Sequence, residues 1–421
     1  MPEAQKLSLT ESLSAFDRAQ KLIPGGVAGI RRPYNFVPGE FPVFIESGKG
    51  ARIIDVDGNG YTDYLCAYGP VILGYREDEV DEAVIRQIRD RGFCFSLCQL
   101  HQNRLAEKLR ELIPCAEMTI FAKTGSDATS ISVRLARAHT GRNVILRCGY
   151  HGWHGWCVET KGGVPTKLYE DVHEFAYNDL GGLGRLLEAH QGTVAAVIIT
   201  PYGHPLAEPL QSPAPGFLER VRQLADEHGC LLVFDEIRTG FRLALGGAQE
   251  RYGVTPDLAC FGKAMANGYS ISAVCGREEI MKKAEKEVFI SSTFFPNSLG
   301  YVAALKTIEI LQRERVLEDI WTRGQGFLDE VGRVVGRLNA GARLSGIPPM
   351  FFITFDRDEA GVYKKRRAEF YTQLVRRGVF LQPYHHGYIC WRHTDDELAK
   401  TVTAVENALE TVVDRYGEFT P

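Results

Sequence analysis

A short apolar run that ends in an acid decides the fold prediction: Leu231–Arg238 reads Leu-Leu-Val-Phe-Asp-Glu-Ile-Arg. Four apolar residues in a row are typical of a buried strand. In an open parallel sheet, ligands bind outside the carboxyl ends of the strands, where Asp235 is expected to stand. A second apolar run, Leu258–Phe261, leads into Gly262 and Lys263. We therefore expect an acid and a lysine to meet beside the sheet.

A carboxylate and a lysine in this arrangement suit pyridoxal phosphate chemistry. The amine can form a Schiff base with the cofactor, and the carboxylate can hold the pyridine nitrogen protonated. The simpler interpretation is an ordinary strand-end acid and a surface lysine. Taken alone, the two residues favour that simpler interpretation, so the rest of the chain has to decide.

Composition places the chain among soluble globular proteins. Its 421 residues predict two domains, or one large domain with a smaller one. A hydrophobic content of 44%, a charged content of 24% and a net charge of −4 give no argument for nucleic-acid binding. No segment reaches the apolar length of a membrane span, and the polar N-terminus carries no signal-peptide core. The ten cysteines contain no Cys-x-x-Cys pair, so we expect reduced thiols in a cytoplasmic protein.

From Met118 onward, apolar runs alternate with helical patterns. Strands are expected at 118–121, 143–146, 194–200 and 231–234, and helices at 129–140 and 215–228. This rhythm predicts a mainly parallel sheet with helices on both faces. Outside it, we expect helices at 9–22, 77–91, 102–112, 301–313, 314–340 and 395–413, and strand structure within 41–66, 343–355 and 378–382.

Three further stretches could carry chemistry. Thr124–Ala128 lies between a strand and a helix, and free helix amides there could hold a phosphate, although a plain N-cap at Asp127 explains the pattern as well. Gly149–Trp156 interleaves aromatics with glycines, which suits stacking on a flat ring. Its two histidines lack a third ligand at metal-site spacing, so no metal site is expected. Hydroxyls in Ser291–Asn297 could serve a phosphate or simply precede a helix.

With these stretches in place, the chain resembles a fold-type I, class III pyridoxal phosphate aminotransferase, and most closely the glutamate-1-semialdehyde 2,1-aminomutase branch. The resemblance runs from Pro24–Val27 to Arg392–Asp395, and its most specific parts are Phe234–Arg242 and Gly262-Lys263. It implies an α/β fold with a large, mainly parallel sheet domain of the seven-stranded type, flanked by helices, at residues 76–310. A small α+β domain would be built from both termini, residues 1–75 and 311–421. The family also implies a homodimer with shared active sites.

The resemblance assigns the cofactor residues. Lys263 would form the internal aldimine and move the proton between substrate and cofactor. Asp235 would pair with the pyridine nitrogen, Ile237 would pack on one face of the ring, and Tyr150 would stack on the other.

The resemblance also assigns the anion sites. Gly125 and Ser126 would bind the cofactor phosphate, and Thr293 would reach the phosphate of the neighbouring subunit. Arg32 aligns with the arginine that binds a substrate carboxylate in the semialdehyde aminomutases; without the resemblance, it could equally be part of a solvated basic loop.

Two departures from the family pattern bear on the substrate. Lys123 replaces a usual asparagine before the phosphate turn, and Thr200 replaces the glutamate of a usual Glu-Pro pair. By analogy, such changes suggest a specialised amino-sugar, aminocyclitol or natural-product pathway. The pocket wall is expected to include Arg31, Tyr34, Trp153, His204 and Tyr384.

We therefore expect an aminotransferase that moves an amino group from an amino-acid donor to a carbonyl acceptor. An aminomutase that moves nitrogen between adjacent carbons is the main alternative, favoured by Arg32 and opposed by Lys123 and Thr200. A racemase or epimerase with the same site, or a cofactor-free protein of this fold, remain further alternatives. The sequence names neither donor nor acceptor.

Overall fold

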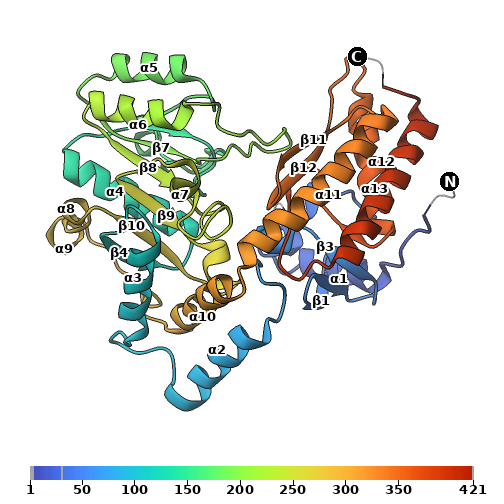
Figure 1. Ribbon diagram of the computed structural model, residues 1–421, viewed down its shortest axis with the longest axis horizontal. Coiled ribbons are helices and arrows are strands. Elements are labelled where there is room, and N and C mark those ends of the chain that lie inside the picture. The colour runs from blue at the N-terminus through green and yellow to red at the C-terminus, as the bar shows by residue number, and fades with distance from the viewer. Residues whose placement is uncertain (1–3, 30–31, 420–421) are drawn as a thin grey trace. The chain divides into compact units, whose positions relative to one another are not determined.

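Seven strands form the central sheet of the larger of two compact units (Figure 1). Six of them run in the same direction, and β10, which lies between β4 and β9, runs antiparallel to both. The mainly parallel sheet predicted from the alternating pattern is therefore confirmed. In spatial order the strands are β4 (Met118–Ala122), β10 (Ser272–Gly276), β9 (Leu258–Phe261), β8 (Leu231–Asp235), β7 (Val194–Ile199), β5 (Val144–Cys148) and β6 (Val172–Glu174).

The structure is a computed structural model that describes residues 4–29 and 32–419. The larger unit comprises Asp78–His204 and Gln211–Leu317, and the smaller comprises Met1–Glu77, Pro205–Leu210 and Glu318–Pro421. None of the helices within the described ranges is both long and apolar enough to cross a membrane.

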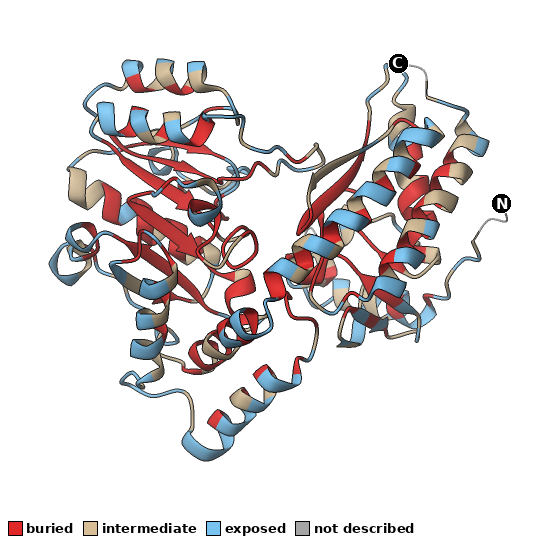
Figure 2. Cartoon of the chain, viewed as in Figure 1, coloured by how far each residue is buried: buried red, intermediate tan, exposed pale blue. Residues whose placement is uncertain are grey.

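The central strands form because their residues are apolar on both faces. Every residue of β7 and β8 is buried, and Figure 2 shows the strands of this sheet in red beneath helices whose outer surfaces are pale blue. Helix α4 (Gly125–Thr140) packs Ile131 and Leu135 into one cluster with Ile198 and Val233. Because side chains alternate along a strand, Asp235 lies on the same face as Val233, the face that α4 covers.

Helix α4 begins four residues before the predicted start at Thr129. Thr124 is its N-cap, and its hydroxyl accepts a hydrogen bond from the amide of Asp127 at 3.2 Å. The Asp127 carboxylate accepts one in return from the amide of Thr124 at 2.8 Å, which closes a capping box. Asp127 is thus the third helical residue and not the N-cap, and the predicted phosphate turn is the first turn of the helix itself.

The larger unit has further helices. They are α2 (Asp78–Arg91), α3 (His101–Leu112), α5 (Leu180–Ala189), α6 (Phe217–Glu227), α7 (Ala248–Tyr252), α8 (Glu278–Met281), α9 (Lys283–Lys286) and α10 (Leu299–Arg313). Of these, α2 packs against α10.

The smaller unit joins the two ends of the chain through strand pairing. Strand β13 (Val379–Phe380) pairs in parallel with β3 (Gly60–Asp63) and completes a four-stranded sheet with β1 (Ile45–Lys49) and β2 (Arg52–Asp55). Strands β11 (Ala342–Ile347), β12 (Met350–Phe355) and β14 (Gly387–Tyr388) form a second sheet. The helices of this unit are α1 (Thr10–Gln20), α12 (Val362–Arg376) and α13 (Asp395–Tyr416), with α11 (Val316–Leu338) starting at its boundary.

Candidate active site

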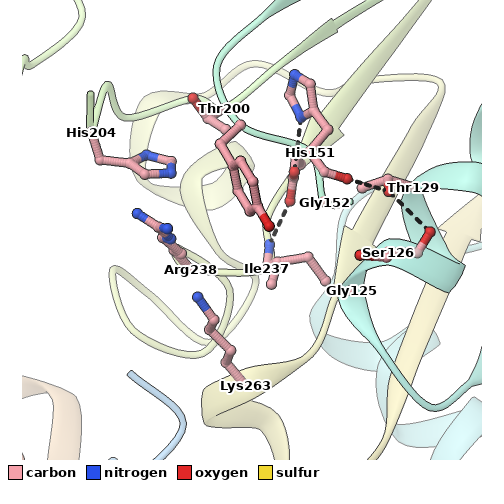
Figure 3. Close-up of a pocket in the computed structure, with 12 residues that line it drawn as sticks. Gly125, Ser126, Thr129, His151, Gly152, Thr200, His204, Ile237, Arg238 and Lys263 are labelled. Carbon is pink, nitrogen blue, oxygen red and sulfur yellow. Dashed lines mark hydrogen bonds and ion pairs between the residues drawn. The ribbon is translucent and has the colours of Figure 1, made fainter. Parts of the chain in front are cut away.

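A cavity of about 230 Å³ opens at the carboxyl ends of the parallel strands in the larger unit (Figure 3). Six residues predicted from the sequence line it together: Gly125, Ser126, Tyr150, Asp235, Ile237 and Lys263. The other lining residues are Thr129, His151, Gly152, Thr200, His204 and Arg238. Thr293 is not among them, and the side chain of Arg32 lies outside the described residues. The roles assigned to all eight residues stay predictions.

The carboxylate of Asp235 is held by two donors. His151 Nδ1 lies 2.9 Å from Asp235 Oδ2, and the amide of Ile237 donates to Oδ1 at 3.1 Å. Since a carboxylate can only accept, the His151 proton on this contact must sit on Nδ1. His151 Nε2 is buried without a hydrogen-bond partner among the described residues, which fits a neutral ring with its single proton on Nδ1. This arrangement fixes the direction in which Asp235 faces the cavity.

The adjacent acid, Glu236, has a structural role. Glu236 is fully buried and accepts hydrogen bonds from the amides of Ala248 and Gln249 and from the hydroxyl of Thr239. Burial raises the pKa of Glu236 to about 7, against the lowering effect of these donors. Glu236 therefore anchors the loop that follows β8, while Asp235 faces the cavity.

Lys263 follows β9 and places its amine in the cavity wall (Figure 3). Loss of solvent around the amine lowers the pKa of Lys263 well below 10.5, the charge of Arg238 lowers it further, and Asp235 opposes the shift. The backbone of Lys263 has φ of +42°, a conformation that non-glycine residues rarely adopt and that marks many functional sites. A neutral amine at neutral pH is what attack on a carbonyl requires.

Two glycines allow the cavity walls to approach one another. An ideal Cβ on Gly152, where φ is +113°, would stand 2.3 Å from Ser126 Oγ. A Cβ on Gly125 would stand 3.1 Å from Ile237 Cγ2. Glycine at these two positions brings the Tyr150 loop, the α4 N-terminus and Ile237 around one space. Thr129 connects α4 to the Tyr150 loop, because its hydroxyl donates a hydrogen bond to the carbonyl of His151 at 2.7 Å.

The first amides of α4, those of Gly125 and Ser126, have no acceptor within the helix and lie at the positive end of its dipole. Together with the Ser126 hydroxyl, these amides could donate hydrogen bonds to an anion on one side of the cavity. A carboxylate, an amine of lowered pKa, an anion site, an apolar side chain and an aromatic ring thus surround one space. This set of groups fits pyridoxal phosphate, which when bound supplies an electron sink for the carbon that bears the amine.

Sequence reasoning missed part of this site. The sequence presents His151 only as a possible metal ligand, whereas in the structure it contacts Asp235; its position next to Tyr150 is the available signal. Arg238 stands out in the sequence only as part of a family motif, whereas in the structure it lines the cavity. Of the expected wall residues in this unit, His204 lines the cavity and Trp153, which is 70% exposed, does not. Lys123 does not line it either, since its amine donates to the carbonyl of Asn297 at 3.1 Å.

The family model for the class III aminotransferases matches residues 36–409. The chain belongs to this family. It is 61% identical over 409 residues, 97% of this chain and 99% of the relative, to a 3-aminobutyryl-CoA aminotransferase of Cloacimonas acidaminovorans. It is 34% identical, over 96% of this chain and 98% of the relative, to a glutamate-1-semialdehyde 2,1-aminomutase of Pelotomaculum thermopropionicum.

A solved structure supports the same assignment. The FumI protein of Sphingopyxis sp. MTA144, in its PLP internal aldimine form, is 33% identical and superposes with a TM-score of 0.91 over 98% of this chain and 99% of that one. The chain is thus a fold-type I, pyridoxal phosphate-dependent aminotransferase, and the predictions of family, fold class, cofactor and enzyme class are confirmed.

Lys263→Ala should abolish covalent attachment of the cofactor, because it removes the amine that lines the cavity. After reconstitution and borohydride reduction, peptide mass spectrometry should find the cofactor on Lys263 in the wild type and nowhere in the variant. Because the pKa of Lys263 is lowered, the rate of attachment should rise with pH and level off well below pH 10.5. A variant that still forms the visible band, or a rate that climbs up to pH 10.5, would contradict this role.

Proposed function

We propose that this aminotransferase exchanges an amino group between an amino acid and the β-carbon of an acyl-CoA thioester. The observation that carries the proposal is the 61% identity, over 97% of the chain, with an enzyme named for 3-aminobutyryl-CoA. The semialdehyde aminomutase relative stands at 34%. Such a reaction is an exchange between two molecules, whereas an aminomutase moves nitrogen within one.

The chemistry of the cavity supports a substrate without a charge beside its reacting carbon. Strand β7 leads into Thr200, a neutral residue, and His204 lines the cavity close by. Asp235 is the sole carboxylate among the lining residues that the structure describes, and it is held by His151. The part of the wall formed by Thr200 at the end of β7 therefore sets no charge against a neutral thioester.

In this proposal, each residue has one task. The α4 N-terminus would bind the cofactor phosphate, and Asp235 would hold the pyridine nitrogen protonated. Lys263, as a neutral amine, would accept the proton from the substrate carbon that bears the amino group. In the second half of the exchange, it moves a proton in the opposite direction to the acceptor.

A half-reaction experiment tests the substrate. Mixed with 3-aminobutyryl-CoA, the holoenzyme should lose the visible band of its lysine-bound cofactor and release a 3-oxoacyl-CoA, detected by mass spectrometry. Adding 2-oxoglutarate or pyruvate should restore the band. 3-Aminobutyrate, which lacks the thioester, should react far more slowly. No reaction with the thioester, alongside turnover of glutamate 1-semialdehyde, would favour the aminomutase.

We also propose that the protein is a homodimer. Five large apolar side chains are exposed on two segments of the larger unit: Phe95, Leu97, Leu100, Phe289 and Phe294, with exposed fractions from 47% to 82%. The two segments are joined where the amide of Ser298 donates to the carbonyl of Phe93 at 2.9 Å. Thr293 is exposed within the same surface. An apolar surface around a threonine that the family uses toward a neighbouring phosphate supports shared sites.

Co-expression of two inactive variants tests shared sites. Thr293→Asp sets a carboxylate against the phosphate, and Lys263→Ala removes the amine. In a purified hybrid dimer, Lys263 of one subunit and Thr293 of the other would complete one site, so about half of the wild-type turnover should return. An inactive hybrid would contradict a site shared in this way, and a monomer in light scattering would contradict the dimer.

A cytoplasmic location is part of the same proposal. All ten cysteines are free thiols, eight of them buried, as expected in a reducing compartment.

A further inference from the structure

Arg238 is a charged wall residue of the cavity with no assigned role. It follows Ile237 after β8, and Figure 3 shows its side chain on the side of the cavity away from Gly125 and Ser126. Its charge acts on Lys263: among the charged neighbours, Arg238 has the largest lowering effect on the pKa of the lysine. Arg238 therefore faces the reacting end of the cavity and not the phosphate end.

No described residue forms a hydrogen bond or ion pair with Arg238. Asp235 already accepts from His151 and from the amide of Ile237. Asp235 is the only acid among the lining residues that the structure describes, and Thr200, which also lines the cavity, is neutral. A half-buried guanidinium without a counter-charge is costly unless a ligand supplies the negative group. The cavity is thus short of one anion on the side of Arg238.

The two substrates of the proposed reaction differ in this respect. An α-amino acid carries a carboxylate on the carbon that bears its amine, whereas an acyl-CoA has a neutral thioester. The planar guanidinium fork matches a carboxylate with two parallel hydrogen bonds. The amino group of the substrate has to lie beside Lys263. The α-carboxylate of an amino acid, one carbon away from that amino group, then lies close to Arg238, whose charge acts on Lys263.

We propose that Arg238 binds the α-carboxylate of the amino-acid substrate and is not required by the acyl-CoA substrate. This assignment rests on the proposed function only for the identity of the second substrate. In this assignment, Arg238 allows one cavity to bind the amino acid, which has a charged α-carboxylate, and then the acyl-CoA, which has a neutral thioester. The phenolate oxygen of the cofactor is the competing anion, and the experiment has to separate the two.

The test compares one amino acid with its own amide. Half-reaction rates are measured for alanine against alaninamide, or for glutamate against its α-amide, whichever pair reacts faster. Arg238→Met removes the charge and keeps the length of the side chain. It should lower kcat/KM for the acid roughly 10- to 100-fold, the worth of a hydrogen-bonded charge pair, and change the rate with the amide less than about threefold. Arg238→Lys should recover part of the loss, and Arg185→Met, an exposed control on α5, should change neither rate.

Cofactor readouts make the outcomes distinct. Arg238→Met should retain the cofactor affinity of the wild type and the same pH midpoint of its visible band. Equal losses for the acid and its amide, a shifted midpoint with unchanged acid-to-amide preference, or a wild type that reacts with no α-amino acid would each overturn the proposal. Failure of the acyl-CoA reaction alone would show instead as a wild type inert to 3-aminobutyryl-CoA that keeps the Arg238-dependent preference.

Discussion

The contact between His151 and Asp235 is the interaction on which the site depends. Asp235 closes β8 at the carboxyl edge of the sheet, on the face that α4 covers. The ring of His151 and the amide of Ile237 fix both carboxylate oxygens, so the acid has one orientation and cannot turn away to find other partners. The pyridine ring is rigid, so binding its nitrogen at Asp235 also determines where its other substituents lie. Lys263 and the α4 N-terminus can contact the cofactor only if they stand at those positions.

Strand alternation explains why two neighbouring acids act so differently. Asp235 faces the cavity, and Glu236 turns to the other side and anchors the following loop through the amides of Ala248 and Gln249. That loop in turn holds Ile237 and Arg238 at the cavity. The positions of the charged groups in the cavity therefore follow from the course of the backbone. Asp235 is hydrogen-bonded, the amine of Lys263 is shielded from solvent, and Arg238 is available to a ligand.

The sequence predicts the parts of this structure that depend on local pattern. The apolar runs of β7 and β8 are buried on both faces, so their strands were predictable from composition alone, and the residues at strand ends meet as parallel-sheet topology requires. The alternating pattern does not predict β10, which begins at Ser272 directly after a loop and enters the sheet antiparallel. The start of α4 was also misplaced, because the capping box between Thr124 and Asp127 extends the helix back over the glycine turn.

The interactions that tune the site could not be predicted in this way. His151 and Asp235 are 84 positions apart, and only the folded chain shows that they touch. The lack of a counter-charge on Arg238 depends on what stands at Thr200, His204 and Asp235 at once, which no single motif contains. The most direct test of the account is the ¹⁵N chemical shift of labelled pyridoxal phosphate bound to the wild type and to Asp235→Ala, with Asp329→Ala, an exposed acid on α11, as control. A protonated pyridine nitrogen in the wild type and control, and an unprotonated one in Asp235→Ala, is the predicted result; a protonated nitrogen in all three would contradict it.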